Sequence, residues 1–164
     1  MKPEARRKKP VFSLTRKDGA MAELAAQTGH TTLAVWAVDC AERVLPYFEE
    51  NYPDDPRPRN ALEACRAWIK TGEFRMAVIR SASLGAHAAA RETGKDSAAR
   101  SAARAAGQAV ATAHVLTHAL GAAKYAQQAV FRAAGPTDAE AAAAGERDWQ
   151  YRRLLALRER SAPD

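Results

Sequence analysis

The chain has 164 residues, enough for one domain, and alanine makes up about a quarter of them. Alanine is the best helix-forming residue, while isoleucine, phenylalanine and tyrosine are scarce. We therefore expect an all-α fold, a compact alanine-rich bundle of about seven helices. No apolar stretch approaches the ~20 residues that a membrane-spanning helix needs, which argues against a membrane protein.

The formal charge of +6 is concentrated at the start of the chain. Residues 1–17 hold seven basic side chains against one acidic, whereas residues 18–164 hold 18 of each. We expect residues 1–17 to be a disordered basic tail, residues 18–158 a single neutral domain, and residues 159–164 a frayed end. The tail could bind phosphate groups weakly through residues 2–17, but the neutral domain is not typical of a nucleic-acid-binding fold.

Capping residues, prolines, glycines and apolar spacing divide the domain into helices. Thr15 and Asp18 resemble a capping box for the first helix, which stops at Gly29. Pro46 interrupts the apolar repeat of the second helix and should kink it, and the proline-rich segment 53–59 should form a rigid connector. The expected helices cover residues 15–29, 30–52, 58–72, 73–92, 96–120, 122–134 and 137–158.

Two of these helices have distinctive faces. In helix 73–92, Phe74, Val78 and Ala82 share one spacing and form the expected apolar face, with Leu84 and Ala88 beside them. Helix 96–120 is the most alanine-dense, and its small side chains would let neighbouring helices approach closely. We therefore expect it to be the central helix of the bundle.

The rarer apolar residues also lie within helical patterns. Cys40 and Cys65 have apolar neighbours, which favours buried free thiols over a disulfide or a reactive pair. Trp36, Trp68 and Trp149 fall on helical apolar faces, which favours core anchors over a platform for stacking bases.

The stretch HVLTH places His114 and His118 four residues apart, so both would share one face of a helix. A zinc site needs three or four ligands, and only His87 is available as a third central histidine. No glutamate stands between the pair, and no further ligand follows at a diagnostic spacing. We favour histidines that pack and form hydrogen bonds between helices, with a metal or ligand site left open as the alternative.

The stretch DCAER places Asp39 and Arg43 four apart on an otherwise apolar helix. A buried charge must be paired, so the pattern favours a structural ion pair that also involves Arg57 or Arg66. The alternative is a carboxylate–arginine group that holds a ligand. Asp39, Glu42, His87 and His114 could also supply acid–base groups, but no phosphate loop, nucleophile elbow or dinucleotide-binding motif accompanies them.

Four separated motifs occur in order: LAVWAVDCAERVLPYFE, DDPRPRNALEACRAWIKTGEF, AARAAGQAVATAHVLTHALGAAKYAQQAV and ERDWQ. Together they resemble the immunity protein five-like family of bacterial polymorphic-toxin systems, over residues 30–157. The resemblance implies a helical domain that binds a cognate toxin and blocks it, without catalysis. The positions that match the family's polar motifs are Asp39, Glu42, Arg43, Asp55, Arg57, His87, His114 and His118.

We interpret the chain as a non-catalytic, cytoplasmic immunity-like protein whose partner is a toxin, and we expect no cofactor, no metal and no membrane association. The absence of an apolar leader also argues against secretion by a signal peptide. One alternative is an enzyme or small-ligand binder with a pocket around His87, His114 and His118. Another is a nucleic-acid-associated protein that uses its basic tail. Self-association into a homo-oligomer is left open.

Overall fold

The computed structural model describes residues 10–16 and 18–161, and within these ranges it contains helices and no strand. The helices are α1 (Gly19–Ala26), α2 (His30–Val44), α3 (Pro46–Glu49), α4 (Arg57–Thr71), α5 (Met76–Arg91), α6 (Ala98–Ala111), α7 (His118–Ala133) and α8 (Ala139–Ser161). The predicted all-α bundle is confirmed. The single-turn α3 is the continuation of the second expected helix beyond Pro46, at which the regular part of that helix ends.

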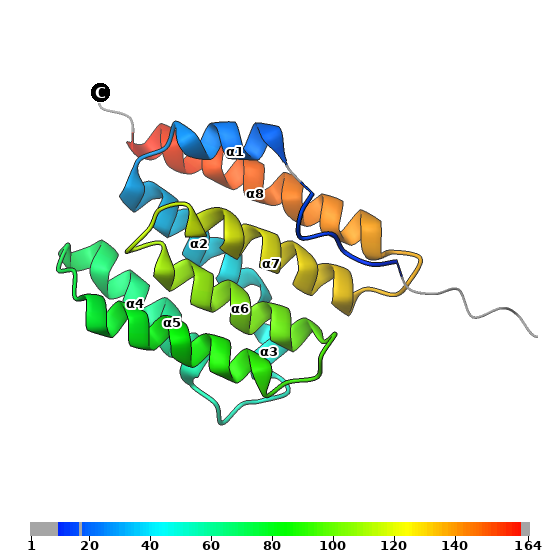
Figure 1. Cartoon of the computed structure of the whole chain (residues 1–164). Helices are drawn as coiled ribbons and strands as arrows, with labels where there is room; N and C mark the ends of the chain where they lie inside the picture. Colours follow the sequence, from blue (N-terminus) through cyan, green and yellow to red (C-terminus); the bar gives the residue numbers. More distant parts are fainter. Residues whose placement is uncertain (1–9, 17, 162–164) are drawn as a thin grey trace, which may run out of the picture.

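The helices form two layers, with α5, α6, α7 and α8 side by side in one layer and α2, α3 and α4 behind them (Figure 1). Consecutive helices of the front layer run in opposite directions, and α1 packs against α8. Helix α6 contacts both α5 and α7 as well as the rear layer, so the alanine-rich helix is central as predicted. Within the described residues, no helix has the length and apolar character needed to cross a membrane.

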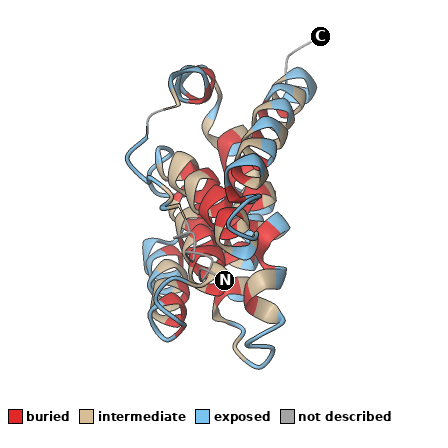
Figure 2. Cartoon of the chain, turned by 90° about the vertical axis from the view of Figure 1, so that its right-hand side faces the viewer, coloured by how far each residue is buried: buried red, intermediate tan, exposed pale blue. Residues whose placement is uncertain are grey.

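Small side chains fill the centre of the bundle. Nine of the 14 residues of α6 are buried, and the largest of these is Val110. Figure 2 shows that buried residues gather along the middle of the molecule, where the layers meet. Larger side chains such as Trp36, Phe48 and Leu62 are fully buried in the rear layer. The core therefore combines a large-residue rear layer with an alanine-rich central helix.

Two glycines allow other side chains to lie directly on a helix backbone. A Cβ on Gly107 would lie 2.7 Å from Nε2 of His87, and a Cβ on Gly121 would lie 2.8 Å from Oε1 of Gln108. Both distances are shorter than normal van der Waals contact. Gly72 has a different role, because its φ of 69° provides the left-handed residue that ends α4.

Polar groups in the core are hydrogen-bonded. The indole Nε1 of Trp36 donates to the carbonyl oxygen of Gln150 at 2.8 Å, which links α2 to α8. Among the described residues, no buried side-chain nitrogen or oxygen lacks a partner. Cys40 and Cys65 are buried free thiols as predicted, and burial raises the pKa of Cys65 to about 12.

The predicted helix over residues 96–120 is wrong at its C-terminal end. Helix α6 ends at Ala111, residues 112–117 form the turn, and α7 begins at His118. Backbone hydrogen bonds tighten to an i→i−3 pattern here, as in Ala113 N–H to Val110 O at 3.1 Å. The chain must reverse so that α7 can pack against α6, and it does so without glycine or proline.

The expected apolar face of the helix over residues 73–92 is wrong for its larger side chains, although Ala82 packs against the core. Ile79, Ala86 and Ala90 of α5 face the core. Phe74, Val78 and Leu84 are instead 43%, 51% and 57% exposed. Helix α6, a principal neighbour of α5, buries mostly alanine, so alanine-sized side chains on α5 allow the two helices to approach closely.

Described contacts extend beyond residues 18–158 at both ends of this range. Residues 10–16 belong in part to the fold, because the ring of Phe12 packs edge-on against Phe131 with 5.4 Å between centroids. Lys124 Nζ also donates to the carbonyl oxygen of Arg16. Helix α8 continues to Ser161, beyond the boundary expected at residue 158. Residues 1–9, 17 and 162–164, which include most of the predicted basic tail, lie outside the described residues.

Candidate functional site

Asp39 and Arg43 lie on α2, and each pairs with α8 instead of with the other. Arg153 Nε donates to Oδ2 of Asp39 at 2.8 Å. Arg43 makes a bidentate pair with Glu146 through Nε at 2.8 Å and Nη2 at 3.0 Å. The predicted Asp39–Arg43 pair with Arg57 or Arg66 is therefore wrong, because α2 lies beside α8 and this edge of α2 faces α8.

The Arg43–Glu146 pair is the most enclosed of these contacts. The Glu146 side chain is only 6% exposed, and the guanidinium of Arg43 lies 3.9 Å from the ring centroid of Trp149. The hydrogen bond to Glu146 raises the pKa of Arg43. A bidentate pair next to an aromatic face fixes the orientation of the two helices. The pair therefore acts as a structural ion pair that holds α2 against α8.

Glu42 belongs to a second cluster, centred on Arg59 of α4. Arg59 Nη1 donates to both carboxylate oxygens of Glu42 at 2.7 and 2.8 Å, and its Nη2 donates to Glu49 at 2.7 Å. Arg66 adds a weaker contact to Glu42 at 3.7 Å. The two carboxylates raise the pKa of Arg59. This cluster joins α2, α3 and α4.

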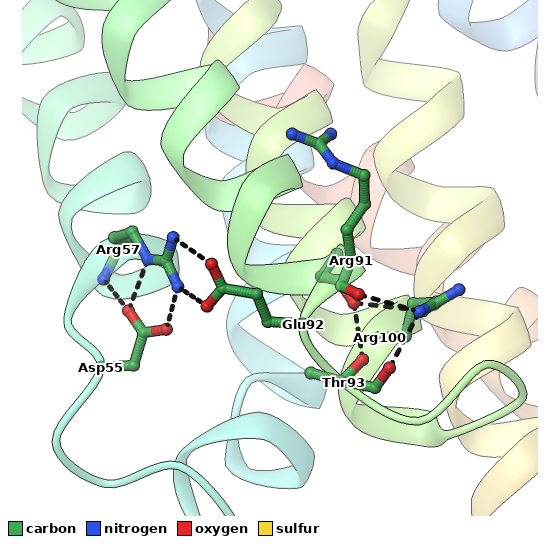
Figure 3. Close-up of polar contacts among 7 residues, drawn as sticks. Asp55, Arg57, Arg91, Glu92, Thr93 and Arg100 are labelled. Carbon is green, nitrogen blue, oxygen red and sulfur yellow. Dashed lines mark hydrogen bonds and ion pairs between the residues drawn. The ribbon is translucent and has the colours of Figure 1, made fainter.

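Asp55 and Arg57 form a third cluster together with Glu92 (Figure 3). Asp55 accepts from the backbone N–H, Nε and Nη2 of Arg57 at 3.1, 2.9 and 2.7 Å. Arg57 also donates to Glu92 at the end of α5, with Nη2 at 2.5 Å from Oε2. Hydrogen bonds from Arg57 lower the pKa values of Asp55 and Glu92. The cluster ties the connector before α4 to α5.

The three predicted histidines occupy separate environments around the α5–α6–α7 contacts. His87 packs on Gly107, and His118 Nδ1 lies 2.7 Å from Oε1 of Gln108. His114 is exposed in the turn and stacks with Phe74 at 6.2 Å between ring centroids. Because a turn separates α6 from α7, the premise that His114 and His118 share a helix face is wrong.

His87 has the most perturbed environment of the histidines. Burial lowers its pKa, and the nearby positive charges of Arg104 and Arg91 lower it further, with a smaller contribution from His118. The neutral imidazole is therefore favoured. Its position on the Gly107 backbone matches the predicted role in helix packing.

The described residues contain no metal-ligand cluster, and three hollows that they form are lined by residues other than the histidines. No three of the histidine, cysteine, aspartate and glutamate side chains in the described ranges are grouped to hold a metal ion. One hollow of about 600 Å³ lies between residues 11–16, 18 and 19 on one side and α7 and α8 on the other. Two others lie along α8 near Asp148 and at the connector before α4. None of these three is lined by His87, His114 or His118.

The sequence identified one partner of several ion pairs and missed the other. Asp39, Glu42, Arg43, Asp55 and Arg57 were predicted, and their partners lie up to 114 positions away in sequence. The partners that were missed are Glu49, Arg59, Glu92, Glu146 and Arg153. Glu146 stands in the ERDWQ motif that contributed to the family resemblance, so its place in that motif was the available signal.

A family model described as Imm-5 like putative immunity protein matches residues 23–157. The chain belongs to the Imm-5 like putative immunity protein family. The matched region contains all three ion-pair clusters and the histidines, and it leaves out the basic residues at the N-terminus. Comparisons with curated proteins and with solved structures return no match. The resemblance inferred from the four sequence motifs is thereby confirmed at the level of the family.

Proposed function

We propose that this member of the Imm-5 like family is an immunity protein that binds a cognate toxin and blocks it without catalysis of its own. Membership of the family over residues 23–157 is the observation that carries the proposal. The proposal places the protein in the cytoplasm, as one half of a toxin–immunity pair of a polymorphic-toxin system.

The use of the charged residues supports a binding role. Most of the charged residues at the predicted site are held in ion pairs that join helices, as with Arg43–Glu146 and Asp39–Arg153. A general acid or base needs a carboxylate or imidazole within reach of substrate and free to exchange a proton. Here the carboxylates are engaged by guanidinium groups, which suits a rigid scaffold that presents a surface to a partner.

The proposal is tested with the toxin encoded beside the gene for this chain. The two proteins are co-expressed with a tag on the toxin, and capture of this chain is measured together with growth of the host. We expect co-purification and restored growth. A matched control is Leu62→Asp, which places a charge at a fully buried position and should abolish both effects by unfolding the scaffold. Growth arrest by the toxin despite abundant folded chain would overturn the proposal.

A further inference from the structure

The domain is neutral overall, but its charge is divided between two parts of the bundle. Residues 76–133, which form α5, α6 and α7, hold seven lysines and arginines and two acidic residues, a net charge of +5. The rest of the range 18–164 holds eleven basic and sixteen acidic residues, a net charge of −5. The three helices α5, α6 and α7 are adjacent in the fold (Figure 1). The excess positive charge of the domain therefore lies on three adjacent helices and the turns that join them.

The basic side chains follow stripes on the three adjacent helices. The stripe on α5 contains Arg80, Leu84 and Arg91, at steps of four and seven, and Arg100 and Arg104 of α6 lie one turn apart. Contacts between the helices bring side chains of the two stripes near one another. Arg104 lies 5.8 Å from the ring centroid of Tyr125 on α7, and Arg104 and Arg91 both act electrostatically on His87. We call this set of stripes the basic face.

Among the described residues, three arginines of the basic face lack the carboxylate partner that most other arginines have. Elsewhere, Arg43, Arg57 and Arg59 hold carboxylates at 2.8 Å or less. Arg80, Arg91 and Arg104 have no carboxylate oxygen within 4.0 Å in the part of the chain that the structure describes.

Arg100 donates to backbone carbonyl oxygens at the end of α5, including those of Ala90 at 3.1 Å and Thr93 at 2.8 Å, and not to a carboxylate of the described residues. Figure 3 shows the Arg91 side chain directed away from that cluster. The positive charge on this face is therefore available to a partner from outside the chain.

Apolar side chains accompany the arginines. Leu84 lies between Arg80 and Arg91 on the α5 stripe and is 57% exposed. Phe74 and Met76, at the start of α5, are each 43% exposed, and Phe74 stacks on His114 of the turn before α7. Arginine together with aromatic residues and methionine is typical of protein interfaces. Nucleic acid binding would use the cations without a need for exposed leucine and methionine, so the composition favours a protein partner.

We infer that the basic face is the docking surface for an acidic surface of a protein partner. This inference rests on the proposed function, under which that partner is the toxin. Arg80, Arg91 and Arg104 offer guanidinium groups to aspartate and glutamate carboxylates, and Leu84 provides an apolar contact among them. Opposite charges across an interface accelerate association and make it sensitive to salt.

The experiment measures association of the neighbouring toxin with this chain by surface plasmon resonance at low and high salt. The test variant is Arg80→Glu/Arg91→Glu, at two exposed side chains. The matched control is Arg158→Glu/Arg160→Glu at the end of α8, which makes the same change in net charge where no carboxylate partner lies within 4.0 Å among described residues. We expect the association rate to fall by about tenfold or more for the test variant at low salt, and by less than about twofold for the control.

Circular dichroism of each variant establishes that it is folded, and Arg104→Gln provides a milder second variant. If the test variant and the control bind the toxin equally well, the inference is overturned while the proposed function stands. If the wild-type chain binds no toxin, the proposed function and the inference both fail. Two further outcomes overturn the inference. In the first, the test variant loses binding to a short DNA duplex but still binds the toxin; in the second, it loses self-association but still binds the toxin.

Discussion

Replacement of Gly107 by alanine tests whether close contact between helices depends on the missing side chain. A Cβ at this position would lie 2.7, 2.8 and 2.9 Å from three ring atoms of His87. The imidazole is packed between α5 and α6 and would have to move. Gly145, inside α8, is the matched control, because a Cβ there would meet nothing within 4 Å.

The two substitutions share one favourable effect and differ in one unfavourable effect. Alanine in place of glycine stabilises a helix interior by about 1 kcal/mol. Extra atoms in a packed core cost about 1–3 kcal/mol. We therefore expect Gly145→Ala to raise the free energy of unfolding by up to ~1 kcal/mol and Gly107→Ala to lower it by ~0–2 kcal/mol. The difference corresponds to roughly 2–12 °C in Tm for a chain of this size.

The free energies are measured by urea denaturation followed by circular dichroism. The same pair of substitutions is repeated in a His87→Ala background, in which the obstructing ring is absent. There Gly107→Ala should stabilise the protein about as much as Gly145→Ala does. If Gly107→Ala already matches Gly145→Ala in the wild-type background, the close approach of α5 and α6 is not limited by this contact, and the reasoning fails.

Three further predictions concern the polar and thiol groups. Arg43→Met should lower the free energy of unfolding by about 1–3 kcal/mol, which is less than the loss of one partner from a fully buried pair because Arg43 is 40% exposed. Glu146→Gln should lower it by less than Arg43→Met does, and equal losses in denaturation would contradict this asymmetry. The pKa of His87, measured by NMR, should lie below the usual ~6.5 and rise in Arg104→Gln. The unfolded state then binds the proton first, so stability should be full above pH ~6.5 and fall as the pH drops through the lowered pKa, a trend that His87→Gln should weaken. Because burial raises the pKa of both thiols, neither should react with Ellman's reagent in native protein at mildly alkaline pH, and rapid labelling would show that the core opens.

The helical architecture could be read from the sequence because alanine content, capping residues and prolines act locally. Pro46 and Gly72 ended helical segments where expected. The turn over residues 112–117 was missed because tertiary packing reverses the chain there, and no glycine or proline indicates it. Local sequence signals therefore predict most helix ends. A chain reversal imposed by packing against neighbouring helices leaves no such signal in the sequence.

The candidate site was less predictable because its contacts join distant parts of the chain. Asp39 could be recognised as a charge that needs a partner, but only the fold places Arg153 beside it. The basic face could not be predicted, because the total charge says nothing about where charges lie in the fold. The charges of residues 18–164 sum to zero, although the positive charges gather on three adjacent helices.

The account rests on the claim that this family member acts by binding a partner and not by turnover. The most direct test titrates the activity of a fixed amount of the neighbouring toxin with increasing amounts of purified chain. Binding alone predicts that toxin activity falls in proportion to the chain added and is abolished at a fixed molar ratio. Progressive loss of toxin activity with a small fraction of that amount would indicate catalytic inactivation and contradict the account.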